Sequence, residues 1–172
     1  MKYKNLCTFG GSTIDEIEYD FICGYVKEHK IKNVLEFGTG ISTYCFLEND
    51  CEIVSFEYQS KYFNYYKNIF NKYGNVNMVM FDNTNPIIIK DFTFPFFDMA
   101  FIDSPKGGKR KRHDCARLNS CIFSSDKTNT IMIHDSKRRS EITSIEAMKE
   151  HGWHVDYALD SRRGITVIRK DD

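Results

Sequence analysis

The chain has 172 residues, of which 41% are hydrophobic and 15% aromatic, so it can bury one sizeable core and has little room for a second. Its 24 Lys and Arg residues balance 24 Asp and Glu residues, so a preference for a charged partner has to come from local clustering of charge. No apolar run approaches the length that crosses a bilayer, and the first residues are too polar for a secretory signal. We therefore expect one domain, residues 1–172, that is cytoplasmic and has no membrane contact.

The six cysteines contain no CxxC pair and no spacing typical of a zinc site. Most of them stand among apolar residues, as expected of free thiols in a reducing compartment. Their positions are Cys7, Cys23, Cys45, Cys51, Cys115 and Cys121.

Hydrophobic periodicity divides the chain into helices and strands. The first helix is predicted from about Thr13 to Lys30, with a capping box in which Ser12 or Thr13 pairs with Glu16. Further helices are predicted at residues 42–47, 61–73, 115–123 and 136–150. Strands are predicted at residues 33–36, 52–57, 76–81, 97–102, 130–134, 153–159 and 165–169, while residues 84–94 fit neither pattern. In the helix at 61–73 we expect the large side chains to pack in the core: Tyr62, Phe63, Tyr66, Ile69 and Phe70.

The last two strands are separated by only a short link, Asp160 to Gly164. Such a link requires an antiparallel hairpin, because a parallel return needs a crossover of about a dozen residues. Five strands alternating with helices, followed by this hairpin, predict the α/β class. The expected architecture is a three-layer, Rossmann-like, doubly wound sheet that is mostly parallel, with one reversed strand of the C-terminal hairpin at its edge.

The stretch from Asn33 to Ser42 joins an apolar strand, an acid at Glu36 and two glycines, Gly38 and Gly40. Glycines permit backbone conformations that a side chain blocks, and they let a ligand approach the main chain closely. Amides at the start of the following helix attract a negative group. A dinucleotide dehydrogenase is disfavoured, because Thr43 stands where its third glycine is expected and there is no second domain.

Polar residues also end the next two predicted strands. Glu57 follows the glycine turn by about twenty residues, where α/β nucleotide folds place the acid that bonds a ribose hydroxyl. Asp82 and Asn83 end the strand after it and reach the same rim if the strands are parallel.

The glycine turn, Glu57, Asp82 and the final hairpin together resemble a class I S-adenosylmethionine-dependent methyltransferase, over about Thr13 to Arg169. That resemblance implies S-adenosylmethionine as the cofactor. It assigns the methionine part of the cofactor to the turn, the ribose to Glu57 and the adenine edge to Asp82 or Asn83. The turn residues concerned are Glu36, Gly38, Thr39, Gly40 and Ser42.

A narrower likeness involves two segments at strand ends, Ile102 to Gly107 and Ile133 to Asp135, together with Arg138. They resemble the plant glucuronoxylan methyltransferase family of polysaccharide-modifying enzymes. This likeness implies O-methylation of a hydroxyl on an anionic or saccharide acceptor.

A basic run leaves the predicted ligand rim at Lys106 and continues to His113, with Arg117 a helical turn beyond. Guanidinium groups bind carboxylate or phosphate in two-point geometry, so the run suits an anionic substrate. A solvated surface loop or a nuclear-type signal remains an alternative. The predicted substrate-binding residues are Lys106, Arg110, Arg112, His113, Arg117 and Arg138.

Three residues at strand ends, Asp103, His134 and Asp135, are the predicted catalytic groups. A hydroxyl acceptor loses its proton as it attacks, and His134 or Asp103 is the candidate general base. Asp135 has a second interpretation, in which it caps a helix starting near Ser136.

Two other functions stay open. In a metal-dependent small-molecule O-methyltransferase, Asp103 and Asp135 would hold a divalent ion. The sequence favours a metal-free site, because Ser136 stands where catechol-type methyltransferases commonly have an Asn ligand. A non-catalytic nucleotide-binding or nucleic-acid-binding module is disfavoured by the balanced charge.

Overall fold

The computed structural model describes residues 1–11, 13–81, 96–105 and 116–171. Its helices are α1 (Glu16–Glu28), α2 (Ile41–Glu48), α3 (Ser60–Phe70), α4 (Ala116–Ser125) and α5 (Arg139–Glu150), with a short 3-10 turn at Lys4–Leu6. Its strands are β1 (Asn33–Phe37), β2 (Glu52–Glu57), β3 (Val76–Met80), β4 (Met99–Ile102), β5 (Thr130–His134), β6 (Trp153–Leu159) and β7 (Ile165–Lys170). The residues predicted as helix or strand are therefore largely confirmed in type, with ends that shift by a few positions.

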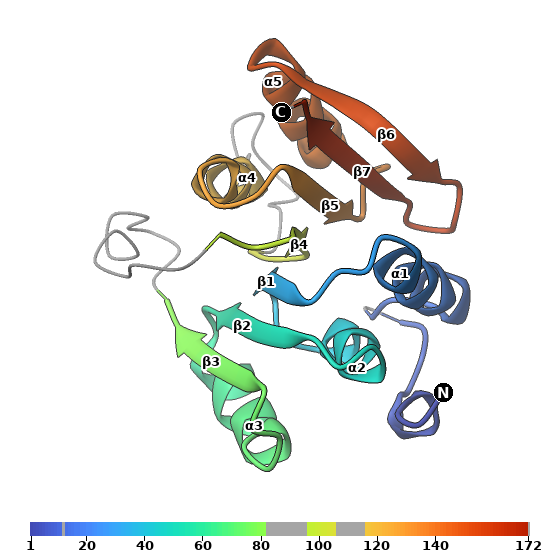
Figure 1. Ribbon diagram of the computed structural model, residues 1–172, viewed down its shortest axis with the longest axis vertical. Helices are drawn as coiled ribbons and strands as arrows, with labels where there is room; N and C mark the ends of the chain where they lie inside the picture. Colours follow the sequence, from blue (N-terminus) through green and yellow to red (C-terminus); the bar gives the residue numbers. More distant parts are fainter. Residues whose placement is uncertain (12, 82–95, 106–115, 172) are drawn as a thin grey trace.

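The strands form one seven-stranded sheet in the order β3-β2-β1-β4-β5-β7-β6 (Figure 1). Strands β1 to β5 run parallel, and β7 is antiparallel to both β5 and β6. From β1 the chain winds outward to β3 and then returns to the other side of β1 as β4. The boundary between β1 and β4 is thus the point where the winding reverses, where ligands bind in such sheets.

Helices cover both faces of the sheet and make three layers (Figure 1). One buried cluster joins α1 and α2 to the strand face that carries Val34 and Ile53. A second cluster joins α4 and α5 to the opposite face, which carries Leu35 and Ile133. The predicted three-layer α/β architecture is confirmed.

The reversed strand lies one place further in than expected. Strand β7 is inserted between β5 and β6, so β6 forms the edge. The burial pattern explains this arrangement, since Ile165 to Ile168 are buried in succession while most of β6 is exposed. A strand with apolar residues on both faces belongs inside a sheet rather than at its edge.

Two expected helix starts were wrong. The capping box of α1 is formed by Asp15 and Glu18, not by Ser12 or Thr13 with Glu16: the Glu18 amide donates to Asp15 Oδ1 at 2.9 Å, and the Asp15 amide donates to Glu18 Oε2 at 2.8 Å. Helix α5 begins at Arg139 with Arg138 as its N-cap, so Asp135 does not cap it.

Further expectations concern the thiols and the membrane. The described cysteines, Cys7, Cys23, Cys45, Cys51 and Cys121, are free thiols, and Cys115 lies outside the described residues. Among the helices that the structure describes, none is both long and apolar enough to span a membrane.

Candidate active site

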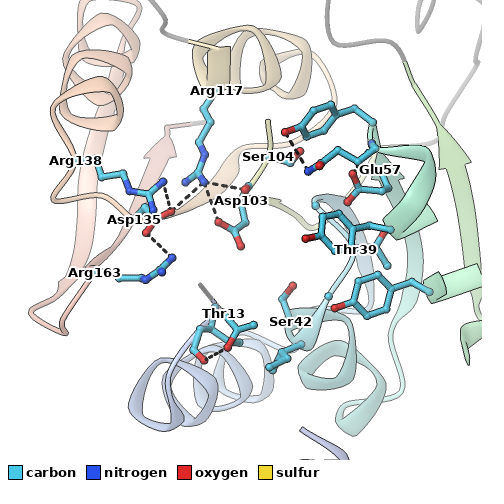
Figure 2. Close-up of a pocket in the computed structure, with 18 residues that line it drawn as sticks. Thr13, Thr39, Ser42, Glu57, Asp103, Ser104, Arg117, Asp135, Arg138 and Arg163 are labelled. Carbon is cyan, nitrogen blue, oxygen red and sulfur yellow. Dashed lines mark hydrogen bonds and ion pairs between the residues drawn. The ribbon is translucent and has the colours of Figure 1, made fainter. Parts of the chain in front are cut away.

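A cavity of about 280 Å³ opens at the carboxyl ends of the parallel strands, next to the boundary between β1 and β4. This volume is near the lower end of the range for small-molecule sites, roughly 300–1,000 Å³. One wall carries the turn after β1 and the start of α3, and the other carries arginines from three separate segments (Figure 2). The lining residues that the sequence predicted are Gly38, Thr39, Gly40, Ser42, Glu57, Asp103, Arg117, Asp135 and Arg138.

The two glycines of the turn have different roles. Gly38 has a φ of +101°, and a Cβ there would lie 3.0 Å from the Ser104 Cβ, so both conformation and space require glycine. Gly40 has a φ of −177°, which is extended backbone that any residue adopts, so the conformational reason expected for it was wrong. A Cβ at Gly40 would lie 3.8 Å from the Tyr66 hydroxyl across the cavity wall. Gly40 therefore keeps space for a ligand.

Glu36 organises the turn from beneath instead of lining the cavity. Its carboxylate accepts hydrogen bonds from the hydroxyls of Ser42 at 2.5 Å, Thr43 at 2.8 Å and Ser55 at 2.5 Å. Burial raises the pKa of Glu36 to about 7, although these three hydroxyl donors act in the opposite direction. Glu36 was predicted to contact the cofactor directly. Both of its carboxylate oxygens already accept hydrogen bonds from the protein.

Glu57 stands at the carboxyl end of β2, where the sequence placed it. Its side chain lines the cavity, and Oε1 accepts a hydrogen bond of 2.7 Å from the Gln59 amide. Burial raises the pKa of this carboxyl above its ordinary value. Tyr62 and Tyr66 also line the cavity. Tyr62 is 44% exposed, against the expectation of core packing, whereas Tyr66 packs against the core as expected. Their i, i+4 spacing at the start of α3 is the signal that places both on one face.

Arg117, near the start of α4, is buried at the base of the opposite wall with 3% of its side chain exposed. Its Nη1 donates to the His134 carbonyl at 2.6 Å, and its Nε donates to the Pro105 carbonyl at 3.2 Å. Its Nη2 donates to Asp103 Oδ1 at 3.0 Å and to Asp135 Oδ2 at 3.1 Å. Arg117 was predicted to bind substrate, but its guanidinium is engaged by the protein itself.

Asp135 is the point on which three arginines converge (Figure 2). Besides Arg117, it pairs with Arg138 at 2.8 Å and with Arg163 at 3.1 Å. Its φ of +58° is rare for a residue other than glycine and is tolerated best by Asp and Asn. Arg163 was not predicted, because only the antiparallel pairing of β7 with β5 brings the 160–164 link beside Asp135.

His134 is fully buried between two carboxylates. Its Nδ1 lies 2.8 Å from Asp103 Oδ1, and its Nε2 lies 3.2 Å from Glu18 Oε2. Burial alone would lower the pKa of His134, but the neighbouring Asp103 and Glu18 carboxylates raise it to about 9. Both ring nitrogens thus face carboxylate acceptors, and the raised pKa favours the protonated ring; the role of His134 as general base stays a prediction.

Asp103 connects the buried His134 and Glu18 to the cavity. Its side chain is 26% exposed, and Figure 2 shows the carboxylate directed into the space between the two walls. Burial favours a raised pKa, but His134 and Arg117 outweigh it and lower the pKa of Asp103 to about 2. Asp103 is thus an ionised carboxylate facing the cavity.

The basic run remains largely untested. Lys106, Arg110, Arg112 and His113 lie outside the described residues, as do Asp82 and Asn83. The structure adds two cavity residues near the N-terminus, Thr13 and Ile14. The Thr13 hydroxyl donates to the Gly10 carbonyl at 2.7 Å.

The same fold occurs in solved methyltransferases, although no family model and no curated protein matches the sequence. An SAH-bound methyltransferase from Podospora anserina superposes with a TM-score of 0.72 and 18% identity, over 94% of this chain and 81% of that one. An O-methyltransferase from Bacillus cereus in complex with SAH superposes with a TM-score of 0.71 and 16% identity, over 94% of this chain and 84% of that one. The N-methyltransferase NodS from Bradyrhizobium japonicum superposes with a TM-score of 0.66 and 10% identity, over 90% of this chain and 94% of that one. At these identities the likeness confirms the class I methyltransferase fold.

Proposed function

We propose that the protein is an S-adenosylmethionine-dependent methyltransferase that transfers the methyl group to an oxygen of a small anionic acceptor. The observation that carries this proposal is a single cavity with two unlike walls. The glycine turn and Glu57 form one wall, and the arginines gathered by Asp135 form the other. Solved methyltransferases of the same fold that hold SAH support the donor half of the proposal, namely that the methyl donor is S-adenosylmethionine.

The turn side of the cavity fits the cofactor. Gly40 and Ile41, at the start of α2, line the cavity, and the positive end of this helix suits the cofactor's α-carboxylate. The ionised form of Glu57 accepts hydrogen bonds from ribose hydroxyls. When bound, S-adenosylmethionine supplies an activated methyl group on a sulfonium centre.

The arginine side suits an acceptor with a carboxylate or phosphate group. Arg138 and Arg163 both line the cavity while Asp135 fixes one edge of each guanidinium. Held in this way, arginine loses less freedom when it binds an anion. A saccharide acid, as the glucuronoxylan likeness implies, is one acceptor that carries such a group.

Asp103 lies between the two halves and is the proposed residue that contacts the acceptor hydroxyl. An ionised carboxylate accepts the hydroxyl hydrogen bond and so directs an oxygen lone pair toward the donor side. The low pKa of Asp103 makes it a weak proton acceptor, so its main contribution is orientation.

Isothermal titration with S-adenosylmethionine and SAH tests the donor half. We expect saturable binding by the wild type and, in Glu57→Ala, binding weakened roughly tenfold or more through loss of a charge-assisted hydrogen bond. Glu52→Ala, at the exposed start of the same strand, is the matched control and should bind like the wild type. Failure of the wild type to bind either compound would remove the proposal.

Transfer of an isotopically labelled methyl group tests the acceptor half. Pools of small carboxylates, phosphates and acidic saccharides are compared with neutral analogues that keep the hydroxyl groups. Label should enter the anionic pools, and products are identified by mass spectrometry. Equal transfer into neutral analogues would contradict an anionic acceptor and leave the donor half intact.

A further inference from the structure

The cavity contains an arrangement that resembles a divalent metal site. Ligand atoms of Asp103, His134 and Asp135 all lie within 4.8 Å of one another at adjacent strand ends. Two carboxylates and an imidazole at this spacing are a set that Mn²⁺ or a similar ion can use. The question is whether their donor atoms are available to an ion.

Asp103 Oδ1, both carboxylate oxygens of Asp135 and both ring nitrogens of His134 already have partners within the protein. The Arg117 Nη2 atom lies 3.0 Å from Asp103 Oδ1 and 3.1 Å from Asp135 Oδ2, between the two carboxylates. Each ring nitrogen of His134 already has a carboxylate partner, Asp103 at 2.8 Å on Nδ1 and Glu18 at 3.2 Å on Nε2. The residues present therefore do not fit a divalent ion.

The position of Arg117 is also fixed by the main chain. Its guanidinium donates to the carbonyls of Asp103 at 2.8 Å, Pro105 at 3.2 Å and His134 at 2.6 Å. These carbonyls follow β4 and end β5, so the same side chain ties together the ends of two adjacent strands. Arginine remains protonated in proteins, so this cation is permanent.

We infer that Arg117 is the resident cation of the reaction centre, standing where a divalent metal would otherwise be held by Asp103 and Asp135. This inference rests on the proposed methyltransferase function for its catalytic meaning. Arg117 acts as a positioning residue: it holds the two carboxylates apart, with Asp103 directed toward the acceptor and Asp135 toward Arg138 and Arg163. Methyl transfer in this protein then requires no divalent metal.

Binding of Mn²⁺ tests the inference directly. Wild type, Arg117→Met and Arg139→Met are titrated with Mn²⁺, and paramagnetic broadening of the His134 imidazole signals reports an ion at the cluster. Arg139 is an exposed arginine at the start of α5, so Arg139→Met removes the same charge at the surface. We expect broadening in Arg117→Met only, because the cation between Asp103 Oδ1 and Asp135 Oδ2 is then gone, although Asp135 keeps its pairs with Arg138 and Arg163.

Broadening of His134 in the wild type would overturn the inference, as would its absence in an Arg117→Met protein that is folded by circular dichroism. If Arg117→Met does not fold, the inference is tested by removing divalent metals from the wild type with a chelator. The wild type should keep its full transfer activity after treatment with EDTA, whereas a loss that Mn²⁺ or Mg²⁺ restores would contradict a resident guanidinium. The Mn²⁺ experiment does not depend on methyl transfer, so it remains decisive even if the proposed function fails in the titration with S-adenosylmethionine.

Discussion

Glu18 and His134 are 116 positions apart in the sequence, and their side chains meet at 3.2 Å in the interior of the protein. Glu18 lies in the first turn of α1, and His134 is the last residue of β5. Glu18 also accepts a hydrogen bond of 2.5 Å from Ser161, in the link between β6 and β7. This contact joins α1 and the C-terminal hairpin to the floor of the cavity and holds His134 in its charged form.

Stability should depend on pH through His134. Its folded pKa of about 9 lies above its ordinary value of 6.5, so the stabilisation is fully present below pH 6.5 and is lost as the pH rises through about 9. The shift corresponds to about 3 kcal/mol of unfolding free energy. Denaturant unfolding measured across this window tests it, and a flat or rising profile would contradict a charged His134.

Glu18→Gln should lower the pKa of His134, because one of its two carboxylate partners becomes neutral. The fall in stability then still begins near pH 6.5 but ends at a lower pH and is smaller. An NMR titration of the imidazole measures the change in pKa independently. Glu16→Gln, an exposed acid in the same helical turn, is the control and should leave the His134 titration unchanged. An unchanged titration in Glu18→Gln would mean that the contact does not hold the proton.

Alanine at the two glycines of the turn should have opposite consequences. Gly38→Ala forces a side chain into a positive φ and against Ser104, and we expect it to lower the free energy of unfolding by about 2 kcal/mol. Gly40→Ala should leave stability nearly unchanged and weaken cofactor binding, because its Cβ faces the cavity. Thermal unfolding and calorimetry separate the two effects, and equal stability losses would count against these roles.

Ser55→Ala removes one of the hydroxyls that hold Glu36. Burial raises the pKa of Glu36 to about 7, so its ionised form is the costly one and the stability loss should be larger above that pH. Loss of the donor should lower unfolding free energy by about 1–3 kcal/mol there. Ser144→Ala, whose hydroxyl bonds a helix carbonyl, is a buried control, and its effect should not change with pH.

Arg138→Ala tests the arginine side of the cavity. Removing one charged donor should raise KM for an anionic acceptor roughly tenfold with little change in kcat, because the contact is equal in the ground state and the transition state. Arg139→Ala is the neighbouring exposed control. A fall in kcat at unchanged KM would show that Arg138 is not an acceptor-binding residue.

Local sequence patterns were sufficient for most of the framework. The strand at Glu52–Glu57 and the two final strands follow from periodicity and from a link too short for a crossover. The predicted parallel strands also placed Glu57, Asp103 and Asp135 at one rim of the sheet, because parallel strands bring their carboxyl ends together. The capping box at Asp15 was missed because Ser12 and Thr13 offer the same type of signal two or three residues earlier.

The sequence by itself determined the class of fold, the glycine turn and the acids at the strand ends, since each depends on residues close together in the chain. Only the tertiary structure decided what those residues do. Whether His134 carries a proton depends on its burial between Asp103 and Glu18, and whether the strand-end acids can hold a metal depends on Arg117. Charge states and bonding partners of this kind arise from contacts between distant segments in a low-dielectric interior, which no local pattern specifies.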